Sequence, residues 1–481
     1  MERVLNWDLP WEREFEKIAA IPHGSGQERQ LSDYLAAFGR DKGLWTHQDE
    51  HCNVIVKKPA SPGRENSAPL ILQAHMDMVC VKTEGSDHDF TRDPLHLYVQ
   101  DGKIRARETS LGADDCAGVA VILALLEAEG ISHPPLECVF TTGEETGLYG
   151  ARALDLNLLE GRRMISLDAS GVDTAITTTA GGLRIVVTRP FREEKTGDQQ
   201  VFALRVGGLL GGHSGGSIDK NRGNAVKLPA RVLDVLIRGG VDVRLCHLEG
   251  GTHDNAIPSS SRCIFCVDRA QAGRTEELAI QAVRDIVHEL RFSDPNVRLT
   301  LEKAQAEYML DEEDSRDILR LLYLFPSGMV EKSPVLHDLT LTSLNLGTAR
   351  MEQGKLWLEV SLRSGEDIAK YELARQVELL CSLLGASSVR DGDYPGFSYR
   401  EDSPLRALMA EVYSERTGGG RIREIGAHGG CEWGIFSAGL GADVIGLAPV
   451  IENCHTTEEA VVRDSFRETY EFLIDMMERM G

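Results

Sequence analysis

The segment PLILQAHMDMVC, which runs from Pro69 to Cys80, decides the fold. Its first half is short and apolar, as in strands that are covered on both faces. His75 and Asp77 follow two residues apart, and positions i and i+2 of a strand point to the same face. The segment therefore predicts an interior strand whose carboxyl end presents an imidazole and a carboxylate on one side.

Strand-like and helix-like segments alternate around this stretch, up to about residue 182. Apolar strands are expected in NVIVKK, PLECVFTTG and RRMISL, and a helix of small apolar residues is expected in CAGVAVILALLEAEG. This alternation is typical of an α/β domain on a mostly parallel sheet. Residues 183–388 have the mixed pattern of an α+β unit, and the α/β pattern then resumes. The sequence predicts one domain, formed by residues 1–182 and 389–481, that is interrupted by a second domain.

The composition is that of an ordinary globular protein with an acidic excess. The 481 residues are 42% hydrophobic and 26% charged, and the formal net charge is −23. This charge disfavours nucleic acid and anionic membranes as partners, so we expect a small neutral or cationic partner or metal ions. The sequence has no apolar run of membrane-spanning length, no apolar signal-peptide core and ten scattered cysteines. These features predict a cytoplasmic protein.

Polar residues follow the predicted strands where these end, which is where open α/β sheets bind ligands. The set consists of two histidines and several carboxylates: His75, Asp77, Asp114, Asp115, Glu144, Glu145, Asp168 and His455. So many carboxylates repel one another unless cations lie among them, and the pattern therefore predicts a metal site. Histidines and carboxylates without clustered cysteines suit two divalent ions, such as zinc, manganese or cobalt, in a hydrolytic role.

Positions in the sequence suggest roles for some of these residues. Asp77 can accept the second N–H of His75 and so fix its tautomer. Glu144 and Glu145 are adjacent and do not easily point at the same atom, so one would bind metal and the other would take a proton from metal-bound water. The sequence leaves open which residue does which. Asp115 is expected to cap the helix that begins there.

Six motifs, in chain order, resemble those of a known superfamily: HMDMV, TSLGADD, TTGEETG, SLDAS, GGHSGGSIDKNRGNA and ENCHTTEEAV. They are similar to the motifs of the di-zinc aminoacylase/carboxypeptidase metallopeptidases, and most similar to the cytosolic non-specific, or Xaa-His, dipeptidases of the peptidase D type. The resemblance runs from about Pro10 to the end of the sequence. It implies a zinc-exopeptidase-like catalytic domain that is interrupted by a lid domain, through which such enzymes often form homodimers.

The resemblance also implies a role for each residue of the set. Two metal-binding triads share Asp114 as the bridge: His75, Asp114 and Asp168 for one ion, and Asp114, Glu145 and His455 for the other. Metal-bridged hydroxide would attack the peptide carbonyl, with Glu144 as general base and Asp77 orienting His75. The substrates would be dipeptides with a free amino terminus, Xaa-His among them.

Four further residues match substrate-contacting positions of these enzymes. His213 in GGHSGG would stabilise the oxyanion of the tetrahedral intermediate. Asn255 in THDNAIP would contact the substrate, and Arg363 in SLRSG would bind its terminal carboxylate. Glu432 in AHGGCEWGIF would receive the free amine. That motif departs from HAGLECGLF of the dipeptidases, and we expect the ring of Trp433 to pack rather than to reshape the pocket.

Three alternatives remain open. An aminoacylase that acts on N-acyl amino acids would keep the same site but would not need to recognise a free amine. A serine hydrolase could use Ser214 in GHSGG, although its neighbours are glycines and turn formers rather than a strand and a helix. The third alternative is a non-catalytic metal-binding scaffold, which would not require Glu144 in addition to the full set of metal ligands.

Overall fold

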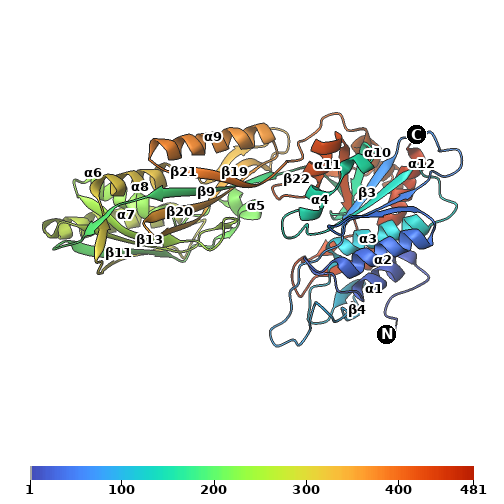
Figure 1. The fold of residues 1–481 in the computed structure, drawn as a ribbon, viewed down its shortest axis with the longest axis horizontal. Helices are drawn as coiled ribbons and strands as arrows, with labels where there is room; N and C mark the ends of the chain where they lie inside the picture. The colour runs from blue at the N-terminus through green and yellow to red at the C-terminus, as the bar shows by residue number, and fades with distance from the viewer. Residues whose placement is uncertain (1–2, 481) are drawn as a thin grey trace. The chain divides into compact units, whose positions relative to one another are not determined.

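The computed structural model describes residues 3–480, which fold into two compact units. The first unit contains the chain up to Thr179, Phe397–Ala427 and the segment from Cys431 onward. The second unit contains Ala180–Gly396 together with His428–Gly430. Figure 1 shows the first unit in blue to cyan and again in red, because the chain returns to it after the second unit has been completed.

An eight-stranded sheet forms the centre of the first unit, in the order β1-β2-β6-β3-β7-β23-β8-β22. The neighbours β6, β3, β7 and β23 are parallel, whereas β1 and β2 pair antiparallel, so the sheet is mixed with a parallel centre. The bounds of its strands are β1 Trp45–Gln48, β2 Val54–Lys58, β3 Leu70–His75, β6 Leu136–Thr141, β7 Arg163–Ser166, β8 Gly171–Thr179, β22 Arg423–Ala427 and β23 Asp443–Ala448.

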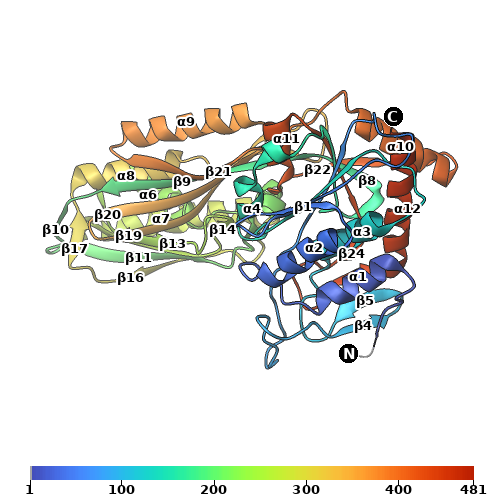
Figure 2. The same cartoon turned by 45° about the vertical axis from the view of Figure 1, so that its right-hand side comes forward.

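Helices cover both faces of this sheet because its strands are apolar on both sides. Leu72 of β3 packs into one hydrophobic cluster and its neighbour Ile71 packs into another. The first cluster is covered by α1 Pro10–Ala19, α2 Arg29–Asp41, α3 Ala113–Glu127, α10 Pro404–Thr417 and α12 Arg463–Arg479. The second is covered by α4 Tyr149–Ala153 and α11 Trp433–Leu440. Figure 2 shows α1, α2 and α3 on the same side of the sheet.

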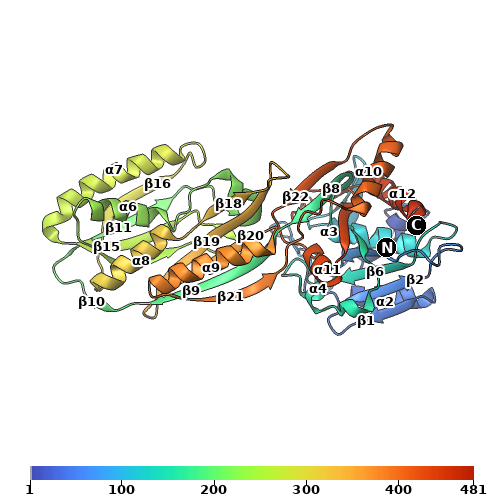
Figure 3. The same ribbon diagram turned by 90° about the horizontal axis from the view of Figure 1, so that it is seen from above.

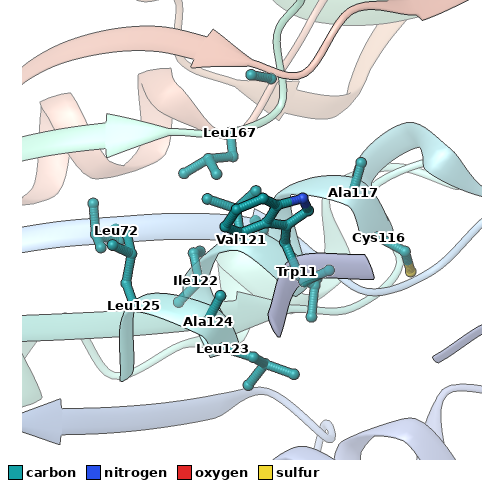
Figure 4. Packing of buried hydrophobic residues seen from close by; sticks show 14 of the residues in the cluster. Trp11, Leu72, Cys116, Ala117, Val121, Ile122, Leu123, Ala124, Leu125 and Leu167 are labelled. Carbon is teal, nitrogen blue, oxygen red and sulfur yellow. The ribbon is translucent and has the colours of Figure 1, made fainter. Parts of the chain in front are cut away.

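The helix α3 is buried along almost its whole length, and this burial fixes the position of its amino end. Figure 4 shows Val121, Ile122 and Leu125 of α3 packed near Leu72 of β3 and Trp11 of α1. A helix that is apolar on all sides belongs inside a protein core. The first turn of α3, which carries Asp114, is therefore held against the end of β3.

A small four-stranded sheet, in the order β24-β25-β5-β4, completes the first unit. Its strands are β4 Leu97–Gln100, β5 Lys103–Ala106, β24 Ile451–Glu452 and β25 Ala460–Val462. His455 lies in the turn between β24 and β25. The pairing of these strands thus fixes the position of His455, which is remote in sequence from β3.

A nine-stranded antiparallel sheet forms the second unit, with the order β16-β11-β15-β13-β19-β20-β9-β21 and with β18 paired to β19. Figure 3 shows α7, α8 and α9 over one face of this sheet, where their apolar residues form a single cluster with the strands. The helices are α5 Ser214–Ser217, α6 Leu228–Arg238, α7 Ala272–Leu290, α8 Glu312–Leu324 and α9 Asp367–Leu383. The strands of the large sheet are β9 Gly181–Pro190, β11 Gln200–Gly207, β13 Val243–Gly250, β15 Ser261–Val267, β16 Arg298–Lys303, β18 Gly328–Lys332, β19 Thr340–Glu352, β20 Lys355–Ser364 and β21 Ser387–Tyr394.

Two short strand pairs lie beside the large sheet: β10 Glu193–Lys195 with β17 Tyr308–Leu310, and β12 Gly212–His213 with β14 Ala256–Ile257. The second unit therefore has the α+β character that the sequence predicts. Within the described residues 3–480, no helix is both long enough and apolar enough to cross a membrane.

Candidate metal centre

Parallel strands bring the predicted ligands of the first unit together. His75 is the last residue of β3, Glu144 and Glu145 follow β6, and Asp168 follows β7. Because β3 lies between β6 and β7 in the sheet, the ends of these strands are neighbours. Three groups have ligand atoms within 4.8 Å of one another: His75, Asp114 and Asp168; His75, Glu144 and Glu145; and Asp114, Glu145 and His455.

Asp114 belongs to two of these groups, and its two carboxylate oxygens face different histidines. Its Oδ1 lies 3.2 Å from Nε2 of His75, and its Oδ2 lies 3.3 Å from Nε2 of His455. Oε1 of Glu145 is 2.7 Å from the same Nε2 of His455. A carboxylate with one oxygen toward each histidine has the geometry that a bridging metal ligand needs.

The electrostatics of the cluster suit divalent cations. Burial, reinforced by the charge of Asp114, raises the pKa of Asp168 to about 7. Burial also raises the pKa of Glu144 well above its usual range. Hydrogen bonds with Asp114 and Glu145 raise the pKa of His455 to about 10, so the imidazole itself serves as a counter-ion. Divalent ions could replace the protonated imidazole as the positive charge that balances these carboxylates. A set of imidazole nitrogens and carboxylate oxygens is chemically suited to zinc.

Asp77 contacts both His75 and the loop that carries Glu144 and Glu145. Nδ1 of His75 lies 3.1 Å from the main-chain carbonyl of Asp77 and 3.5 Å from its Oδ1. The carboxylate of Asp77 also accepts the backbone N–H groups of Glu144, at 3.0 Å, and of Glu145, at 3.3 Å. Asp77 therefore orients the imidazole and also fixes the loop that carries both glutamates.

Glu459 holds the start of α3, a contact that the sequence did not reveal. Its buried carboxylate accepts the backbone N–H groups of four consecutive residues, from Leu111 to Asp114, at 2.8–3.3 Å. It thereby satisfies the amino end of α3, and the expectation that Asp115 caps this helix is wrong. Asp115 has a non-helical backbone in the first turn of α3 and is fully buried, and neither of its carboxylate oxygens has a hydrogen-bond partner among residues 3–480.

We expect Glu459→Gln to lower both stability and metal affinity. The amide keeps the size of the side chain but loses the charge and one acceptor, and each buried N–H left without a partner costs about 1–3 kcal/mol. Thermal unfolding and metal titration of the two proteins would measure both effects. Glu458→Gln is the matched control, because the Glu458 side chain is 79% exposed. Equal unfolding temperatures and equal metal affinities for the two variants would contradict this role.

Glu432 and Trp433 lie on the opposite face of the sheet from α3. Oε2 of Glu432 accepts hydrogen bonds from Gln73, at 2.7 Å, and from Thr141, at 2.5 Å, and burial raises the pKa of its carboxyl to about 8. Recognition of an amine by Glu432 stays a prediction. The Trp433 ring is fully buried and packs edge-on against Phe397, which confirms that it is a packing residue.

The three remaining candidates belong to the second unit. His213 of β12 and Asn255, which directly precedes β14, are both exposed, and the Asn255 carbonyl accepts the N–H of Ser214 at 2.8 Å. Arg363 of β20 is 9% exposed and forms no ion pair within the described chain; its guanidinium lies 3.4 Å from the hydroxyl of Tyr394. Burial and the charge of Arg363 lower the pKa of His213. A buried guanidinium without a carboxylate partner is suited to an incoming anion.

Ser214 does not have the partners of a serine nucleophile. A one-turn helix, α5, does begin at Ser214 directly after β12, so the expectation that no strand and helix flank it is wrong. Its hydroxyl is buried and has no hydrogen-bond partner among residues 3–480. The histidine that would activate such a hydroxyl is therefore not in contact with it.

The chain belongs to peptidase family M20/M25/M40, whose family profile matches residues 71–479. It is 32% identical over 477 residues to the cytosol non-specific dipeptidase of Escherichia coli strain K12, covering 98% of this chain and 97% of that protein. The crystal structure of the aminoacylhistidine dipeptidase from Vibrio alginolyticus matches with a TM-score of 0.90 and 30% identity, over 98% of this chain and 96% of that one.

A tripeptidase from Staphylococcus aureus has the same fold, with a TM-score of 0.58 and 18% identity over 99% of each chain. These similarities confirm the predicted superfamily, the zinc-exopeptidase-like α/β fold and the class of metallopeptidases.

Proposed function

We propose that this protein is a cytoplasmic dipeptidase that uses two divalent metal ions, zinc in the first instance, to hydrolyse dipeptides with a free amino terminus. The observation that carries this proposal is the position of Asp114 between His75 and His455, in groups that adjoin Glu144. The names of the relatives in Escherichia coli and Vibrio alginolyticus support the same class of substrate, and the second of them favours Xaa-His dipeptides.

In this mechanism one triad, His75, Asp114 and Asp168, holds the first ion, and the other, Asp114, Glu145 and His455, holds the second. When bound, such ions polarise a substrate carbonyl and lower the pKa of a water molecule. Glu144 takes the proton from the attacking water and returns it to the leaving amine. Burial and the nearby charge of Asp168 raise the pKa of Glu144, so this carboxyl holds a proton more readily than an exposed glutamate does.

The proposal also assigns substrate contacts to residues of the second unit, as a lid domain. Arg363 binds the terminal carboxylate of the dipeptide, Asn255 contacts its backbone, and His213 stabilises the oxyanion. Glu432 of the first unit receives the free amine. The absence of an ion pair at Arg363 within the described chain supports its part in this assignment.

We also propose that the lid forms a homodimer. Three large apolar residues of α9, Ile368, Leu379 and Leu383, are 82%, 61% and 74% exposed. They recur at helical spacing, so they lie on one face of α9, which a second copy of the lid would cover.

Initial rates on a substrate panel test the proposed function. The protein loaded with zinc or manganese should cleave alanyl-histidine and other unblocked dipeptides, and a chelator should abolish this activity. Faster cleavage of N-acetyl amino acids would instead make the protein an aminoacylase on the same site. Inhibition by a fluorophosphonate would revive Ser214 as the nucleophile, and inertness of the loaded protein toward the whole panel would favour a metal-binding scaffold.

A further inference from the structure

A cavity of about 250 Å³ lies within the second unit and is lined by three cationic side chains, Arg222, Lys227 and Arg231. The first two belong to the segment before α6, and Arg231 belongs to α6 itself. Amide side chains of Asn221 and Asn224 also line the cavity.

The charges that line this cavity do not balance. Arg231 is paired with Glu289, whose carboxylate oxygens lie 3.1 and 2.5 Å from its guanidinium. Lys227 donates to the main-chain carbonyl of Phe325, and Arg222 donates to that of Gly211. Within residues 3–480, neither Lys227 nor Arg222 forms an ion pair with a carboxylate. Three cations and one carboxylate therefore leave two positive charges without a counter-ion.

This imbalance is costly where the cations are partly buried. Burial, together with the charge of Arg231, lowers the pKa of Lys227 to about 8. A buried ammonium usually has an acidic partner, and this chain has 75 acidic residues from which to supply one. The cavity instead keeps two cations beside amide donors, which is the arrangement that a bound anion would neutralise.

We propose that this cavity binds a small oxyanion with two negative charges, of the kind presented by phosphate groups and dicarboxylates. The guanidinium of Arg222 can donate two parallel hydrogen bonds to such an anion, Lys227 supplies a compact charge, and the amide of Asn221 can donate a further hydrogen bond. Binding at this site does not depend on the proposed peptidase activity.

An anion in the cavity would also contact a side chain that supports β12. Besides its bond to Gly211, the guanidinium of Arg222 lies so close to Gly212 that a Cβ atom there would be 2.5 Å from it. Gly212 precedes His213 in β12. The anion would therefore stabilise the conformation of the strand that presents His213.

Isothermal titration of the metal-loaded, full-length protein with inorganic phosphate tests this site. Wild-type protein should bind phosphate in the cavity, and Lys227→Met should weaken this binding at least tenfold because it removes the charge at nearly constant side-chain length. Lys303→Met is the matched control, since Lys303 is exposed on β16 and does not line the cavity. Its phosphate affinity should equal that of the wild type. Competition with sulfate and malonate would show whether phosphate-like or carboxylate ligands fit better.

Several outcomes would overturn the proposal. Phosphate that binds wild-type protein and Lys227→Met equally well would be bound at the metal centre or elsewhere on the surface. No phosphate binding by the wild type, or an equal loss of affinity in Lys303→Met, would also refute it. Thermal unfolding would verify that each variant is folded. If Lys227→Met is not folded, Arg222→Gln provides the same comparison, with Arg298→Gln on the exposed face of β16 as its control.

Discussion

Replacing Glu144 by alanine is expected to lower kcat by about 10²- to 10⁴-fold while the protein keeps its metal ions. Glu144 lies in one ligand group with His75 and Glu145, but it belongs to neither triad that is assigned to the metals. Its loss should therefore remove the proton carrier and leave the metal-binding side chains in place. Steady-state rates on an unblocked dipeptide, together with metal analysis of the same sample, would measure both quantities.

Two further variants make the result for Glu144 specific. Glu144→Gln keeps the size of the side chain and should be nearly as inactive, because an amide cannot accept and return the proton. Glu50→Ala should retain full activity, since the Glu50 side chain is 90% exposed. A kcat of Glu144→Ala close to that of the parent protein would show that another group is the general base.

Asp114→Ala should reduce the affinity for both metal ions, each by at least about 100-fold. The reason is geometric: one carboxylate oxygen of Asp114 faces His75 and the other faces His455, at 3.2 and 3.3 Å. A residue that bridges two ions cannot be lost without weakening both sites. Metal titration monitored by calorimetry would count the ions that remain bound under conditions that saturate the parent protein.

The neighbouring residue supplies the control for this prediction. Burial raises the pKa of the Asp115 carboxyl well above its usual range, and Asp115→Asn keeps the shape of this buried side chain. This variant should bind both ions normally. If Asp114→Ala also bound two ions with normal affinity, Asp114 would not be the bridge.

The sequence predicted the parts of the site that depend on local pattern. The apolar run before His75 defined β3, and the two-residue spacing placed Asp77 behind the imidazole. The same reasoning located Glu144, Glu145 and Asp168 at neighbouring strand ends. These predictions succeeded because the period of a strand and the direction of parallel strands follow from the backbone itself.

The residue that accepts the backbone N–H groups at the start of α3 could not be predicted in the same way. A helix that begins with two aspartates suggests its own cap. The buried carboxylate of Asp115 nevertheless accepts no hydrogen bond within the described chain, and Glu459, more than 340 residues away in the sequence, accepts the N–H groups instead. No sequence motif identifies a glutamate whose carboxylate accepts backbone N–H groups. The adjacent residues Glu458 and Glu459 therefore could not be distinguished from the sequence. Their difference in exposure arises only when β25 pairs with β5.

The amino-acid sequence by itself predicted the order of strands and helices, the side chains that meet at the ends of β3, β6 and β7, and the family. Tertiary structure alone decided which oxygen of Asp114 faces which histidine, and it brought Arg222 and Lys227 to one cavity without a counter-ion. The net charge of −23 gives no indication of that cavity, because the net charge is a sum over the whole chain. The hydrophobic periodicity of a strand or helix depends on residues that are close in the sequence. Tertiary hydrogen bonds and local charge balance depend on side chains that meet only after folding.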